Sequence, residues 1–126
     1  MDIAEFEKCQ YMSLATFRKN GAEVKTPVWF AVVDGKVYCY TRIDTGKVKR
    51  LRNSPRARIA PSTFSGEVKG EWLDTSARIV ADLALVARAY AALRKKYGFQ
   101  ISLLTFLTKI TGKLDERVYI EIDYPK

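Results

Sequence analysis

The fold is indicated most strongly by residues 11–41, which read YMSLATFRKNGAEVKTPVWFAVVDGKVYCYT. Tyr11–Phe17 alternates and is rich in residues that suit a pleated surface, so it predicts a strand. The K-N-G and D-G steps that follow are hairpin-turn signals. Between them, Thr26–Val33 is almost continuously apolar, as expected of a strand covered on both faces. With Lys36–Thr41 as the next strand, this region predicts a three-stranded meander.

The rest of the chain adds strands and a few helices to this meander. Further strands are predicted at 57–60, within 67–80, where one or two fit, and at 117–123, which alternates cleanly. Helices with capping or stop signals are predicted at 2–9, 45–53, 82–98 and 100–110. Short, mostly antiparallel strands with flanking helices predict a mainly β fold, a closed or partly closed β-barrel.

Length and composition narrow the class of protein. The 126 residues predict a single domain, 1–126. The formal charge of +8 favours an anionic partner, which could be a nucleic acid, a membrane surface or a phosphorylated small molecule. Cys9 and Cys39 form no C-x-x-C pair and are interpreted as free thiols. No signal peptide opens the sequence and no apolar stretch is long enough to span a membrane, so a soluble cytoplasmic protein is expected.

The chain contains no histidine. This removes the commonest general base, the usual Ser-His and Cys-His nucleophile pairs and most zinc sites. We therefore predict no catalytic side chain and no metal site. If the protein is an enzyme, a bound organic cofactor would carry the difficult chemistry.

The most informative segment for function is the start of the predicted basic helix, directly after a strand. A helix N-terminus presents unpaired N–H groups and the positive end of its dipole. Thr45 can cap this helix and donate its hydroxyl, and Gly46 lets an anion approach the backbone closely. Lys47 and Arg50 share one face and would clamp a phosphate. The alternative interpretation is a solvated basic helix with no ligand.

Two other segments carry candidate binding residues. Pro27 is unusual in a strand because it cannot donate to the ladder, so a ligand could lie against the backbone of Thr26, Pro27, Val28 and Trp29. The alternative is an edge strand or bulge, with Trp29 filling the core. Lys69 could reach a cofactor or a partner subunit, although such a lysine is commonly just solvated.

These segments resemble a known family. The sequence contains VKTPVWF at 24–30, YTR at 40–42, GKVKRLRNSPRA at 46–57 and GEVKGE at 66–71, with weaker matches in ARIV at 77–80 and RKKYG at 94–98. In this order and spacing they resemble the pyridoxamine 5′-phosphate oxidase-like split β-barrel superfamily, and most of all its coenzyme F420-dependent oxidoreductase branch. The resemblance covers nearly the whole chain.

The resemblance implies an FMN-binding type of split barrel that forms a homodimer, with two cofactor sites between the subunits. It places the cofactor phosphate at the start of the basic helix and the ring along the strand that contains Thr26–Trp29. The residues implied are Thr45, Gly46, Lys47 and Arg50 for the phosphate, and Thr26, Pro27, Val28 and Trp29, with Thr41 nearby, for the ring system.

The same resemblance suggests which reaction is carried out. Members closer to pyridoxamine phosphate oxidase carry an Arg-Lys pair where this chain has Gly46-Lys47, which argues against that activity itself. The basic charge suits the acidic tail of coenzyme F420, and FMN is the alternative. Hydride would pass directly between the cofactor ring and a small, flat, conjugated substrate, so no side-chain base is needed.

Two other readings compete with a redox enzyme. A nucleic-acid-binding β-barrel would have aromatic and basic residues interleaved on one sheet face, whereas here the cations concentrate on one helix and its flanks. We therefore expect no nucleic-acid or membrane partner. A protein that binds the cofactor without turnover is the third reading, and the sequence leaves it open.

Overall fold

The computed structural model of this protein describes residues 1–98 and 117–125. The predicted helix at 100–110 lies outside these residues. The described part contains one seven-stranded sheet whose strand order is β2-β1-β5-β6-β7-β4-β3, with every neighbouring pair antiparallel. The strands are β1 Tyr11–Phe17, β2 Glu23–Val28, β3 Ala31–Val33, β4 Lys36–Arg42, β5 Arg56–Ser62, β6 Leu73–Val80 and β7 Arg117–Asp123.

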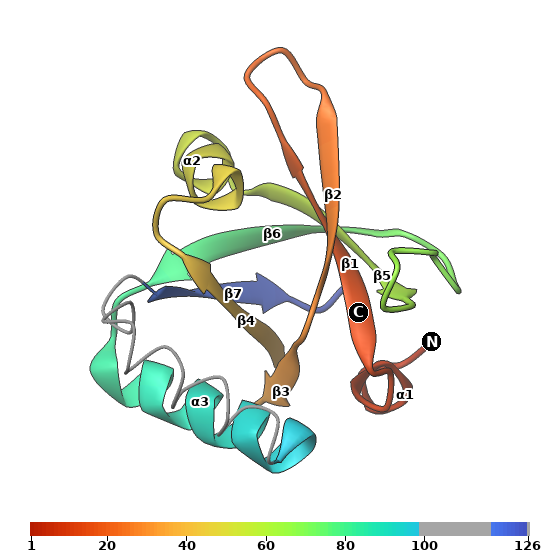
Figure 1. Ribbon diagram of the computed structural model, residues 1–126, viewed down its shortest axis with the longest axis vertical. Coiled ribbons are helices and arrows are strands. Elements are labelled where there is room, and N and C mark those ends of the chain that lie inside the picture. The colour runs from red at the N-terminus through yellow and green to blue at the C-terminus, as the bar shows by residue number, and fades with distance from the viewer. Residues whose placement is uncertain (99–116, 126) are drawn as a thin grey trace.

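The sheet curls into a half-barrel, and three described helices lie around it (Figure 1). This confirms the predicted mainly β, split-barrel fold. The helices are α1 Ile3–Glu7, α2 Gly46–Asn53 and α3 Leu83–Tyr97. The first and third begin at predicted caps: Asp2 accepts a hydrogen bond from the Glu5 N–H at 2.8 Å, and Asp82 accepts one from the Leu85 N–H at 3.1 Å. No described helix is long and apolar enough to cross a membrane.

The predicted meander is wrong at its middle strand. Thr26–Val33 does not form one strand, because the chain leaves the sheet at Trp29 and Phe30. Its first half belongs to β2, which pairs with β1, and its second half is β3, which pairs with β4. These two short strands are the opposite edges of the sheet order, so neither is a central strand. Pro27 therefore lies on an edge strand, where a missing N–H donor is tolerated.

A tyrosine from α3 satisfies the backbone at this break. The Tyr97 hydroxyl lies 3.0 Å from both the N–H and the carbonyl oxygen of Phe30, and 2.9 Å from the carbonyl oxygen of Gln10. It accepts from the N–H and donates to a carbonyl, so the buried polar groups of the break have partners. The apolar run alone carries no sign of this contact, because its partner lies 67 residues away.

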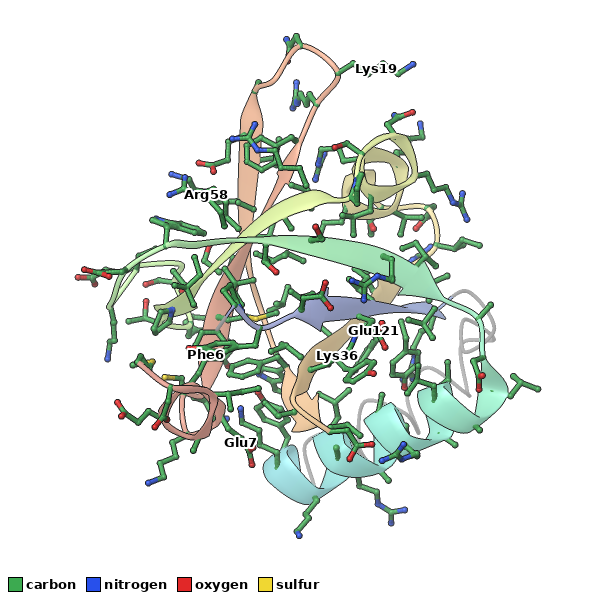
Figure 2. The ribbon with its side chains drawn as sticks, turned by 180° about the vertical axis from the view of Figure 1, so that it is seen from behind. Phe6, Glu7, Lys19, Lys36, Arg58 and Glu121 are labelled. Atoms are coloured by element: carbon green, nitrogen blue, oxygen red, sulfur yellow. The ribbon has the colours of Figure 1, made fainter. Side chains whose placement is uncertain are left out.

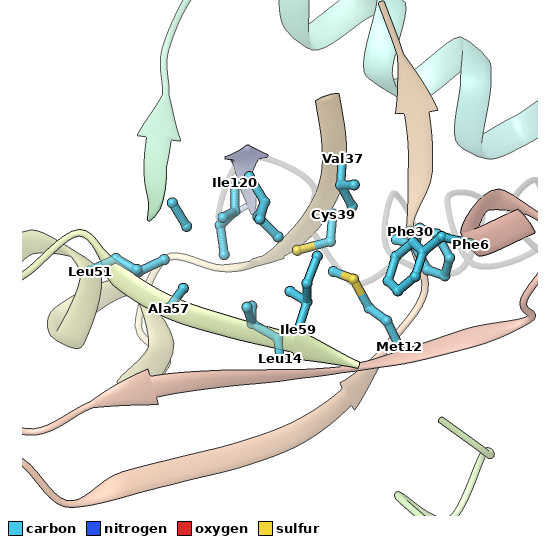
Figure 3. Close-up of a cluster of buried hydrophobic side chains, with 12 residues drawn as sticks. Phe6, Met12, Leu14, Phe30, Val37, Cys39, Leu51, Ala57, Ile59 and Ile120 are labelled. Atoms are coloured by element: carbon cyan, nitrogen blue, oxygen red, sulfur yellow. The ribbon is translucent and has the colours of Figure 1, made fainter. Parts of the chain in front are cut away.

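Two apolar clusters hold the half-barrel together. The inner cluster fills the concave side of the sheet (Figure 3) and comprises Phe6, Met12, Leu14, Phe30, Val37, Cys39, Leu51, Ala57, Ile59, Ala77, Ile120 and Ile122. The outer cluster lies between α3 and the strands β3, β4 and β7, with Ala31, Tyr38, Ala89, Leu93, Tyr97 and Tyr119 buried. Leu51 belongs to the inner cluster, so burial of this side chain fixes α2 against the barrel.

Candidate functional site

The start of α2 leaves its first N–H groups without a side-chain cap. Thr45 is the N-cap residue in extended conformation, but its side chain makes no capping hydrogen bond. Its hydroxyl donates instead to the Arg42 carbonyl at 3.0 Å, and the Thr41 hydroxyl donates to it at 3.2 Å. The predicted side-chain cap is therefore wrong, because the β4–α2 turn engages the threonine first. The helix start keeps amide donors that an anion can accept.

Gly46 and Arg50 are packed against each other. A Cβ atom added to Gly46 would lie 3.2 Å from Arg50 Cζ and 2.5 Å from Arg50 Nη1, and the second distance is too short for a real contact. The guanidinium thus covers the glycine Cα, and a side chain at this position would displace it. Arg50 Nε also donates to the Thr16 hydroxyl at 2.6 Å, and Thr16 is fully buried. The guanidinium is held between β1 and the first turn of α2.

Lys47 adds a second cation beside this guanidinium. It is half-buried, and burial lowers the pKa of its ammonium group, with the charge of Arg50 lowering it further. Burial also lowers the pKa of Arg50, to which the charge of Arg18 contributes. Neither Lys47 nor Arg50 forms an ion pair with a carboxylate in residues 1–98 and 117–125. Two cations held together without an acid form a site that favours an anion.

The second predicted segment lies along the edge strand β2. Thr26 is partly buried, and its hydroxyl oxygen is inaccessible to solvent and has no hydrogen-bond partner. Pro27 is exposed, and Val28 packs against the inner cluster. Trp29 stacks on Tyr97, with ring centroids 4.7 Å apart and planes 12° from parallel. Trp29 is thus anchored by α3, as the core-filling alternative suggested.

Lys69 lies in the connection between β5 and β6. Its N–H donates to the Pro61 carbonyl at 2.8 Å, and its side chain is exposed. It lines a surface pocket of about 510 Å³ together with residues that include Tyr11 and Phe64. Figure 1 shows this connection at the right of the molecule and α2 at the left. Within one subunit the structure therefore does not bring Lys69 to the helix.

The predicted residues form two groups in space, with Lys69 apart from both. One group surrounds the start of α2, where contacts join Thr41 to Thr45 and Gly46 to Arg50, with Lys47 in the same turn. The other follows β2 from Thr26 to Trp29. No hydrogen bond or ion pair among the described residues links the two groups. Their joint role in binding one ligand stays a prediction.

Sequence reasoning missed two residues of this site. Thr16 and Arg18 come from β1 and the turn after it, which were interpreted only as structure. Thr16 orients Arg50, and Arg18 acts on it electrostatically. One signal was available: Thr16 shares a strand face with Met12 and Leu14, and a hydroxyl on a core face needs a partner.

The residues present fit a phosphate-bearing group. The donors are two cations and uncapped amides, and the glycine keeps the guanidinium close to the backbone. Oxygen atoms of a phosphate can accept from all these donors. No cluster of three or more acidic or cysteine side chains that could hold a metal ion occurs in the described ranges.

Several solved structures share this fold. A structure described as an F420 reductase is 14% identical over 99% of this chain and 94% of its own, with a TM-score of 0.64. The heme storage protein HutZ from Vibrio cholerae is 17% identical over 98% and 88%, with a TM-score of 0.73. A FAD-binding protein from Mesorhizobium loti is 18% identical over 96% and 83%, with a TM-score of 0.61. At these identities the similarity shows the fold alone.

A search of curated protein sequences found no match. The sequence profile of one family, described as pyridoxamine 5′-phosphate oxidase, matches residues 2–124. The match spans both predicted binding segments and nearly the whole chain. The chain therefore belongs to the pyridoxamine 5′-phosphate oxidase family of split β-barrel proteins.

Proposed function

We propose that this protein is an oxidoreductase that binds coenzyme F420 by its phosphate at the start of α2. The observation that carries the proposal is the pair Lys47 and Arg50 at an uncapped helix start. Neither cation forms an ion pair with a carboxylate among the described residues. Arg50 is oriented by Thr16 before any ligand arrives. Such preorganised donors bind an anion without first having to be ordered.

Each protein group has a defined task in this proposal. The amides of the first turn, Lys47 and Arg50 hold the phosphate. The edge strand β2 lies along the ring through its exposed residue Pro27, with Thr26 and Val28 on either side of it. When bound, the deazaflavin ring supplies the hydride chemistry. The protein orients the ring against a small conjugated substrate and excludes water from it.

We further propose that the active form is a homodimer. The β5–β6 connection, which carries Lys69, lies on the other side of the molecule from α2 (Figure 1), so Lys69 would contribute to the same ligand from a partner subunit. A dimer would also cover the open side of the half-barrel. Size-exclusion chromatography with light scattering, at concentrations around the working one, measures the oligomeric state.

Coenzyme F420 is favoured over FMN by charge. The chain carries a formal charge of +8, and cations continue beyond Lys47 and Arg50 onto the β1–β2 hairpin, which suits a ligand with acidic groups beyond its phosphate. Gly46 in place of an arginine speaks against pyridoxamine phosphate oxidation. A heme-storage role like that of the similar Vibrio protein would lack the commonest axial ligand, since the chain has no histidine.

The test is a fluorescence titration of the purified protein with coenzyme F420 and with FMN. We expect micromolar or tighter binding of coenzyme F420, and a loss of about tenfold or more in Lys47→Ala and in Arg50→Ala, because each removes a charge-assisted contact. Lys49→Ala is the matched control, since Lys49 lies on the exposed side of the same helix. It should bind as the wild type does.

Three outcomes would contradict the proposal or part of it. Equal losses in all three variants would mean that the helix attracts anions only by net charge. Tight binding of single-stranded nucleic acid, with no response to either cofactor, would support the nucleic-acid-binding alternative. Binding without any hydride transfer to conjugated acceptors would restrict the protein to a binding role.

A further inference from the structure

A second basic pocket lies between the tip of the β1–β2 hairpin and the C-terminal end of α2. Its volume is about 350 Å³, and it is lined by Phe17, Arg18, Lys19, Gly21, Asn53, Ser54 and Arg56. Three of these seven residues are cations and none is acidic. The hairpin projects beyond the sheet, and Figure 2 shows Lys19 at its tip. The pocket is therefore open to a ligand from solution.

None of the described residues neutralises the charges in this pocket. Arg18, Lys19 and Arg56 are exposed and form no ion pair in the part of the chain that the structure describes. The sequence explains why, because residues 8–22 and 45–66 contain no aspartate or glutamate. Like charges gathered without acids repel one another, and a bound anion relieves this repulsion.

One cation of the pocket is held in place by its neighbours. The Arg56 guanidinium lies over the ring of Phe17, 3.9 Å from the centroid. The backbone N–H of Arg56 donates to the Ser54 hydroxyl at 3.3 Å. Stacking on an aromatic face leaves the edge N–H groups of a guanidinium free to donate. Arg56 is thus positioned to bind an oxygen anion.

Arg18 connects this pocket to the site at α2. It lies just after the end of β1, two residues beyond Thr16, and Thr16 is the residue that holds Arg50. Arg18 also lies near enough to Arg50 to lower the pKa of that guanidinium by its charge. The two cationic sites therefore adjoin, with Arg18 between them.

We propose that the pocket at Lys19 and Arg56 is a second anion subsite, which receives a carboxylate or a second phosphate carried by the same ligand beyond the phosphate at Lys47 and Arg50. This inference rests on the proposed function. It predicts that the ligand is more than a mononucleotide, because FMN ends at its single phosphate. An acidic tail and a diphosphate both supply the required group.

The experiment compares coenzyme F420, FAD and FMN in the full-length protein and in the double variant Lys19→Gln with Arg56→Gln. Arg94→Gln with Lys95→Gln is the matched control, because it removes one exposed arginine and one exposed lysine from the last turn of α3. We expect the pocket variant to bind coenzyme F420 or FAD about tenfold more weakly and FMN less than about twofold more weakly. The control should bind all three as the wild type does.

The separate ligands identify the anion. A loss for coenzyme F420 alone assigns the pocket to carboxylates of an acidic tail, and a loss for FAD alone assigns it to a second phosphate. Unchanged binding of both, or an equal loss for FMN, overturns the inference. Thermal unfolding of each variant without ligand verifies that the fold is kept.

Failure of the proposed function would be visible separately. If the wild type binds none of the three cofactors, the cofactor assignment is wrong, and the pocket is tested with pyrophosphate and orthophosphate by calorimetry. The inference then requires tighter binding of pyrophosphate and loss of that advantage in the pocket variant. Equal binding of the two anions overturns it.

Discussion

Lys36 on β4 and Arg78 on β6 have carboxylate partners on β7, whereas the cations of α2 and of the β1–β2 turn have none among the described residues. Arg78 donates to both Glu121 and Asp123, and Lys36 lies 3.1 Å from Asp123 and 3.7 Å from Glu121. Lys36 and Glu121 are labelled together in Figure 2. The Tyr38 hydroxyl completes this network by donating to Glu121 at 2.6 Å.

The difference separates cations that stabilise the fold from cations that are available to a ligand. Partners in the strand network lower the pKa values of Glu121 and Asp123 and so favour their charged forms in the folded state. Lys47 and Arg50 are held near each other without such compensation, which costs stability. This lack of compensation at α2 is what the proposed anion site requires, because a bound anion would supply the missing partner.

The largest expected effect is in the paired region. Arg78→Met leaves Glu121 and Asp123 with fewer partners, and we expect a loss of about 2 kcal/mol in the free energy of unfolding. Urea denaturation at neutral pH measures it. Arg88→Met is the control, because the Arg88–Asp34 pair is exposed on both sides and should contribute less than about 1 kcal/mol. Equal losses in the two variants would contradict the comparison.

Lys96 shows what an unpaired cation costs when its ammonium is buried. Its Nζ atom has no hydrogen-bond partner and lies 3.5 Å from the centroid of the Phe30 ring, and burial lowers its pKa to about 8. An unfolded lysine has a pKa of about 10.4, so between these values the unfolded chain binds more protons and stability rises with pH.

Replacing this lysine should therefore stabilise the protein in a pH-dependent way. We expect Lys96→Met to be more stable than the wild type at pH 7 by on the order of 1–2 kcal/mol, allowing for solvent screening, with the gap narrowing above pH 8. Taking the difference between two variants cancels the titration of the tyrosines. Lys95→Met, at an exposed position, is the control. A gap that stays constant with pH would mean that Lys96 is not the titrating group.

Replacing Lys47 should also raise the free energy of unfolding, by less than replacing Lys96 does. Lys47→Met keeps most of the apolar stem and removes the uncompensated charge, so we expect a gain of up to about 1 kcal/mol in unfolding free energy without ligand. The cofactor should then stabilise the protein less than it does the wild type, which urea denaturation with and without coenzyme F420 measures. A destabilised variant would assign Lys47 a structural role.

The smallest effect concerns the orientation of Arg50. Thr16→Val removes the acceptor at nearly constant shape, and we expect the affinity for coenzyme F420 to fall about threefold to fivefold. The affinity for the same deazaflavin without its phosphate should stay unchanged, and Thr16→Ser should restore binding. A similar loss for both ligands would mean that Thr16 supports the fold rather than the phosphate.

Local patterns were sufficient for much of the fold. The strands at Tyr11–Phe17 and Arg117–Asp123 occur at the predicted bounds, because alternation reports which side chains face the core. The helix predicted from Asp82 to Gly98 is Leu83–Tyr97, since capping and stop signals act within one turn. The basic helix was likewise predicted to within one residue, and Lys47 and Arg50 with it.

The sequence by itself determined the features that depend on near neighbours, namely most strands, helices and turns. Its composition also determined the absence of histidine and the acid-free basic segments. Tertiary structure alone decided that Thr26–Val33 divides between two sheet edges, because its halves pair with different strands and Tyr97 satisfies the backbone between them. It also decided that Thr16 orients Arg50, 34 residues along the chain. Such contacts join residues whose separation leaves no trace in a local pattern, since they form only when the sheet curls and α2 packs onto it.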